Sequence, residues 1–115
     1  MNRIAFLNDE LRRTFARGKV VMTPGVAELP EERLAQVLER VRLFDAFSAD
    51  NDPHGEHDFG SFDIAGVSYF FKIDYYSPDM QGGSEDPSDP EKTMRVLTIM
   101  RADEEEGLPE PPAKP

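Results

Sequence analysis

The sequence contains no cysteine and no tryptophan, and it has no apolar run that approaches the length of a membrane span. Without cysteine the chain cannot form a disulfide, use a thiol nucleophile or hold zinc or an iron–sulfur cluster through thiolates. A spanning helix needs about 20 apolar residues, and residues 1–15 are too charged to form a signal peptide. We therefore expect a cytoplasmic protein that has no membrane contact.

Basic side chains are also scarce, since 13 of them stand against 23 acidic ones for a net charge of −10. The excess lies in residues 45–115, which carry seventeen acidic and five basic side chains. The negative electrostatic field of these side chains repels phosphate backbones, which argues against direct binding of DNA or RNA. It favours cations or a protein partner with a basic surface.

The 115 residues, of which 38% are hydrophobic, are enough for one domain with a small core. Apolar residues at helical spacing predict one helix over Arg3–Arg17 and a second that begins near Pro30. Arg12, Arg13 and Arg17 form a small basic cluster on the first helix, which we interpret as partners of nearby carboxylates. Strands are expected at residues 19–23, 58–64, 67–75 and 95–100, with a turn at Pro24-Gly25 and a long acidic surface loop over 77–91.

This order predicts an α+β fold, a two-layer sandwich with two helices on one face of a mostly antiparallel sheet of about four strands. The domain should cover residues 1–102. Residues 103–115 are rich in Asp, Glu and Pro, and we expect them to form a flexible tail.

Ala65-Gly66 is predicted to be a two-residue hairpin turn, which fixes the register of the strands on either side. Residues whose numbers sum to 131 then face each other, so that one surface of the sheet pairs Phe59 with Lys72 and His57 with Asp74. Phe70 and Tyr76 join that surface by alternation. It is either the solvated side of a half-buried sheet or a recognition or reaction surface with two exposed rings.

Residues 50–58 contain both histidines of the chain and four carboxylates, Asp50, Asp52, Glu56 and Asp58. Such donors could hold a divalent metal, although the spacing matches no established metal motif. Three interpretations stay open: an ordered connection built on side-chain to backbone hydrogen bonds, recognition of a basic partner, or catalysis. In the catalytic interpretation His57 is a general base held by Asp74, and a metal or Lys72 stabilises negative charge.

Several strings of the sequence resemble one known bacterial family. They are residues 50–53, 55–60, 72–76 and 95–100, supported by 7–9, 12–13 and 20–32. These strings are similar to the family known as domain of unknown function 3768, and the resemblance covers the chain to about Ala102. It implies a small protein, often plasmid-borne, with no assigned activity. The resemblance implies an aromatic residue at the position that His54 occupies. It therefore favours His57 over His54 as a site residue.

The favoured hypothesis is a small acidic module that binds a protein partner, as a monomer or a weak dimer. Its predicted contact surface comprises Asp50, Asp52, Glu56, Asp58, Phe59, Phe70 and Tyr76. One form of this function is a DNA mimic that inhibits a nucleic-acid-binding protein. The alternative is a divalent-metal-assisted hydrolase that uses His57, Asp74 and Lys72 together with the 50–58 loop.

Overall fold

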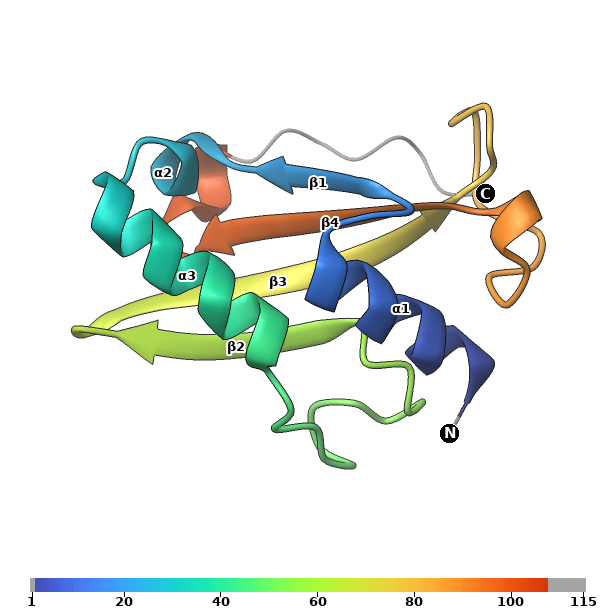
Figure 1. The fold of residues 1–115 in the computed structure, drawn as a ribbon, viewed down its shortest axis with the longest axis horizontal. Helices are drawn as coiled ribbons and strands as arrows, with labels where there is room; N and C mark the ends of the chain where they lie inside the picture. The colour runs from blue at the N-terminus through green and yellow to red at the C-terminus, as the bar shows by residue number, and fades with distance from the viewer. Residues whose placement is uncertain (1, 108–115) are drawn as a thin grey trace.

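The computed structural model describes residues 2–107, and Figure 1 shows their arrangement. The helices and strands are α1 (Arg3–Thr14), β1 (Lys19–Met22), α2 (Pro24–Ala27), α3 (Glu31–Leu43), β2 (Phe59–Ile64), β3 (Val67–Tyr76) and β4 (Met94–Arg101). Two 3₁₀ helices, η1 (Pro90–Lys92) and η2 (Ala102–Gly107), flank β4. Within residues 2–107 every helix is too short or too polar to cross a bilayer.

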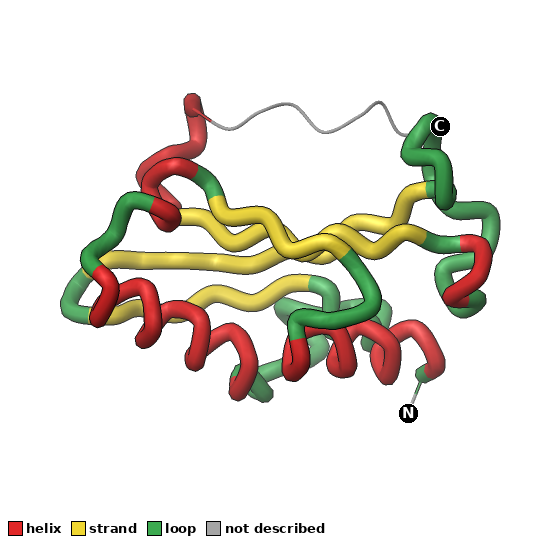
Figure 2. Tube along the Cα trace, turned by 45° about the horizontal axis from the view of Figure 1, so that its top comes forward, coloured by secondary structure: helices red, strands yellow, loops and turns green. Residues whose placement is uncertain are grey.

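The four strands form one mixed sheet in the order β1-β4-β3-β2. β1 runs parallel to β4, and the other two pairings are antiparallel. α1 and α3 lie side by side on one face of the sheet, as Figure 2 shows. The predicted α+β sandwich with a mostly antiparallel sheet is therefore confirmed.

The core lies between that face and the two helices. β2 and β3 alternate along their length, so that every second side chain points to α1 and α3. Gly60 lets two rings pack directly on β2, because an added Cβ would lie 2.5 Å from the Phe71 ring and 2.7 Å from the Phe44 ring. The buried cluster comprises Leu11, Val26, Val37, Val41, Phe62, Tyr69, Phe71, Ile73, Leu97 and Ile99.

The register of the β2–β3 hairpin is the one predicted from the turn. Ile64 faces Val67, Phe62 faces Tyr69 and Phe59 faces Lys72. Ala65 and Gly66 have φ values of 51° and 82°, the left-handed pair that a tight two-residue hairpin turn requires.

One predicted helix end and one predicted turn are wrong. α1 ends at Thr14 instead of Arg17, where the Thr14 hydroxyl bonds back to the Glu10 carbonyl and Phe15 takes a left-handed conformation. Pro24-Gly25, predicted as a turn, begins the one-turn helix α2.

η2, which is distant from α2 in the sequence, is hydrogen-bonded to the start of α2 through Glu104. Glu104 accepts hydrogen bonds from the Thr23 hydroxyl and the Gly25 N–H, both at 2.6 Å, and from the Arg101 N–H at 2.9 Å. Of the predicted tail, residues 103–107 belong to η2, and residues 108–115 lie outside the described part of the chain.

Candidate functional site

The face of the sheet opposite α1 and α3, here called the open face, carries the aromatic pair that the hairpin register predicts. The Phe59 and Phe70 rings lie 5.7 Å apart, and Phe59 is 39% exposed. Beside them, Lys72 Nζ is 3.2 Å from Asp74 Oδ2. β1 and β4 extend this face with Val21 and Thr98, which are partners in the sheet.

His57 does not lie on the open face, so the predicted His57–Asp74 pair is wrong. The antiparallel ladder ends at Asp58, whose carbonyl accepts from the Ile73 N–H. His57 then has a φ of 59°, and this left-handed backbone turns its ring toward α1. Asp74 stays on the opposite face with Lys72.

The His57 ring sits between two carboxylates and against an aromatic ring. Its Nδ1 lies 3.0 Å from Asp9 Oδ1, and its Nε2 lies 3.8 Å from Asp52 Oδ2. The ring stacks on Phe47 with centroids 4.0 Å apart and planes 2° apart. Asp9 orients the imidazole as a general base would need, but Phe47 covers one of its two faces.

Arg12 joins this group to α3. Its guanidinium donates to Asp9 Oδ1 at 2.7 Å and to the carbonyls of Val41 and Phe44 at 2.9 and 2.7 Å. Burial lowers the pKa of Arg12, while the hydrogen bond that Arg12 donates to Asp9 acts in the opposite direction. Only 1% of this side chain is exposed, so it is an internal brace between the helices.

A second buried network lies next to the first. The Asn8 amide donates to the Tyr75 hydroxyl at 2.8 Å and to the Glu56 carbonyl, and its oxygen accepts from Arg95 Nε. The Tyr75 hydroxyl donates to the Glu56 carboxylate at 2.8 Å. Burial raises the pKa of this hydroxyl above its ordinary value of 10.0, so Tyr75 remains a donor. Both networks pin the 50–58 loop to α1 and β3.

The side chains of the 50–58 loop serve largely this attachment. Asp52 is buried and accepts from the backbone N–H groups of Glu56 and His57. Burial also raises the pKa of the half-buried Asp58. Asp50, a predicted contact residue, is exposed. Tyr76 of β3, another predicted contact residue, is only 2% exposed and is therefore not accessible to a partner. The geometry favours the ordered connection among the three interpretations of this loop.

A metal centre finds no support in the side-chain arrangement. Across residues 2–104, whose side chains the structure describes, no group of three or more His, Asp or Glu side chains could hold an ion. The hydrolase hypothesis also needed His57 and Asp74 on one surface, and they occupy opposite faces. The structure therefore does not bring together the two residues on which the hydrolase hypothesis depends.

The comparisons with known proteins identify a family whose function is unknown. The model of a family described as "Protein of unknown function (DUF3768)" matches residues 22–104. This chain is a member of the DUF3768 family. No curated protein and no solved structure matches it. The DUF3768 match includes β2, β3, β4 and the 50–58 loop, whereas α1 precedes it.

Asn8, Asp9 and Arg95 of this DUF3768 protein were not identified by sequence reasoning. Asn8 lies beside Ile4, Leu7 and Leu11 on the apolar stripe of α1, where a polar residue needs a buried partner. That placement was the available signal for Asn8. Asp9 is also buried, but helical spacing puts it away from this stripe. Arg12, Arg13 and Arg17 were predicted to pair with nearby carboxylates, which is confirmed. The structure identifies these carboxylates as Asp9, for Arg12 and Arg13, and Glu10, for Arg17.

Proposed function

We propose that this DUF3768 protein is a binding module for a protein partner with a basic surface. The observation that carries the proposal is the pair of aromatic rings on the open face, with Phe59 exposed. Val21, on the same face, is also 39% exposed. Exposed apolar side chains that gather on one face of a small domain are typical of an interaction surface.

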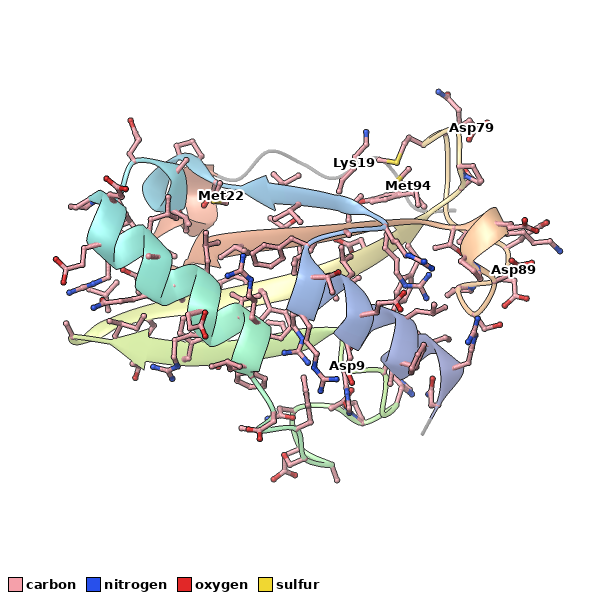
Figure 3. The ribbon with its side chains drawn as sticks, viewed as in Figure 1. Asp9, Lys19, Met22, Asp79, Asp89 and Met94 are labelled. Atoms are coloured by element: carbon pink, nitrogen blue, oxygen red, sulfur yellow. The ribbon has the colours of Figure 1, made fainter. Side chains whose placement is uncertain are left out.

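Acidic side chains stand at one end of this sheet. The 77–91 segment is joined to β3 by a bridge between Tyr76 and Gly83 and by the Ser84 N–H, which donates to the Tyr75 carbonyl. Asp79 and Asp89 of this segment lie at the same end of the molecule as Met94, the first residue of β4 (Figure 3). Hydrogen bonds from the Ser77 hydroxyl and the Gln81 N–H lower the pKa of Asp79, so that it stays charged.

This charge supports a cationic partner. Acidic side chains beside an apolar patch steer basic proteins and disfavour acidic ones. A protein that binds nucleic acid offers such a basic surface, and imitation of DNA would make the module its inhibitor. A cytoplasmic monomer or weak dimer fits this role.

The test is capture of a partner on the immobilised protein. The Val21→Ser/Phe59→Ser double variant should capture about tenfold less of the partner than the unaltered chain, because it loses the exposed apolar side chains on both outer strands of the open face. Phe6→Ser is the matched control, since Phe6 is 49% exposed on α1, on the other side of the molecule.

Equal capture by the double variant and by the control would contradict the proposal. So would a partner that is acidic, or one whose capture does not change between low and high salt.

A further inference from the structure

β2 is the outer strand of the sheet, at its lower margin in Figure 1, and one of its edges pairs with no strand of the sheet. We propose that an extended basic segment of the partner adds to this edge as a fifth strand. The inference rests on the proposed function, because it presumes a protein partner, and it specifies how that partner is held.

The register determines which backbone groups are available. Ile64 and Val67 flank the two-residue turn, and Ile73 donates to Asp58, so the even-numbered residues of β2 bond to β3. The N–H and C=O groups of Phe59, Ser61 and Asp63 therefore point to the free edge. Arg40 confirms this direction, because its Nη1 donates to the Asp63 carbonyl at 3.2 Å. An added strand can pair with this row of groups.

Two hollows beside the edge can receive side chains of the added strand. One, of about 230 Å³, is lined by Leu43, Phe44, Asp45, Ser61 and Phe62 among others. The second, of about 620 Å³, opens at the hairpin end near Ile64 and Glu39. Arg40 lines both and separates them. Alternate side chains of an added strand would enter these hollows, and the others would lie toward Phe59 on the open face.

Leu43 supports an apolar contact in the first hollow. It is the last residue of α3 and is 67% exposed, more than any other large hydrophobic side chain among the described residues. An aliphatic side chain of the partner placed against Leu43 and Phe44 would remove this apolar surface from water.

The charge around the edge favours lysine or arginine in the added strand. Glu39, Asp45 and Asp63 are exposed there, and Glu39 lies 3.8 Å from Arg42. Arg40 already contacts the Asp63 carbonyl and lies over the Phe62 ring at 5.0 Å. A second copy of the chain is the less favourable occupant, because two molecules of net charge −10 repel each other.

β1, the other outer strand, is a poorer template. It has four residues and begins with Lys19, a residue type that blocks edge pairing. β2 has six residues and contains neither lysine nor proline.

The experiment titrates the ¹⁵N-labelled chain with a synthetic peptide of four Lys-Val repeats, capped at both ends, and follows amide exchange by NMR. Saturating peptide should slow exchange at Phe59, Ser61 and Asp63 by about tenfold or more, since these N–H groups gain acceptors. Ser61→Pro should abolish binding, because it removes the central donor. Ser61→Ala, which keeps that N–H, should bind like the unaltered chain.

Ser61→Pro removes no bond to β3, so its spectrum should retain the β3 and β4 signals. Leu43→Lys is a second variant that leaves β2 intact. It should weaken peptide binding about tenfold by placing a cation in the first hollow, while Leu43→Gln should have a smaller effect.

Unchanged exchange at these three amides, binding that survives Ser61→Pro, or a dimer of the free chain through β2 would overturn the inference. The proposed function is judged separately by capture. If a basic partner is captured equally by Ser61→Pro and Ser61→Ala but is lost with Val21→Ser/Phe59→Ser, the binding module stands and the added strand is wrong.

Discussion

Arg12 makes several of the contacts that join α1 to α3. Its guanidinium contacts the Asp9 carboxylate and donates to the Val41 and Phe44 carbonyls at the end of α3. It also lies over the rings of Phe47 and Phe71 at 5.3 and 5.4 Å. The end of a helix leaves carbonyls without intrahelical partners, and here a side chain from α1 supplies the donors. Arg12 therefore fixes α3 against α1 together with the apolar contacts of Leu11 with the core that holds Val37 and Val41.

Arg12→Ala should lower the free energy of unfolding by about 3–5 kcal/mol, because it removes the buried guanidinium that pairs with the Asp9 carboxylate and leaves His57 as the other close partner of that carboxylate. Urea denaturation followed by circular dichroism measures the loss. Arg13→Ala is the matched control, since Arg13 is 62% exposed and 4.0 Å from the same carboxylate, and it should cost less than about 1 kcal/mol. Equal losses in the two variants would show that burial of the pair does not matter.

The hairpin register predicts the face on which a side chain lies only for residues inside the β2–β3 ladder. The register places His57 opposite Asp74 only while the ladder continues, and the ladder stops one residue earlier. A positive φ at a histidine has no sequence signal of its own. Phe59, Phe70 and Lys72 were placed correctly because they lie inside the ladder, where alternation applies.

Among the elements, β2 and β3 were predictable because a two-residue turn joins them and their alternation is local. α2 and η2 were not, because their shared contact links Gly25 to Glu104 across 79 positions. Local propensity at Pro24-Gly25 favours a turn equally well. The contact with η2 selects the helical form.

This contact predicts a pH effect. Burial alone would raise the pKa of Glu104, but hydrogen bonds from Thr23, Arg101 and Gly25 lower it below the ordinary value of 4.5. A lowered pKa in the folded state means that Glu104 contributes stability above about pH 4.5, and that this contribution disappears as the pH falls through the folded-state pKa.

Glu104→Gln should therefore destabilise the chain by about 1–2 kcal/mol at neutral pH, and the difference should shrink toward zero in acid. Chemical unfolding of both proteins at neutral and acidic pH measures this trend. A difference that stayed constant, or grew in acid, would mean that the charged form of Glu104 is not what holds α2.

For the whole molecule, the α+β architecture was predictable because binary patterning fixes the faces of helices and strands. The buried networks that lock the loop to α1 were not, since each joins side chains distant in sequence. The net charge, in contrast, can be calculated from the composition alone.

A net charge of −10 on a compact domain opposes folding through self-repulsion. Sodium chloride raised from about 10 mM to about 150 mM should increase the melting temperature, because the Debye length falls from about 30 Å to about 8 Å. Scanning calorimetry measures the shift. A Glu85→Gln/Glu91→Gln variant, with two fewer exposed charges, should show a smaller rise, and a fall in either protein would contradict the expectation.

The position of β4 has a consequence for biosynthesis. Among the strands of residues 2–107 it is the last to leave the ribosome, yet it lies inside the sheet and joins β1 to β3. The β2–β3 hairpin can form on the nascent chain, but β1 has no neighbour until Met94–Arg101 has emerged. Completion of the sheet must therefore wait until nearly all of the described chain has been translated, and until then the newly made helices have no finished surface to cover.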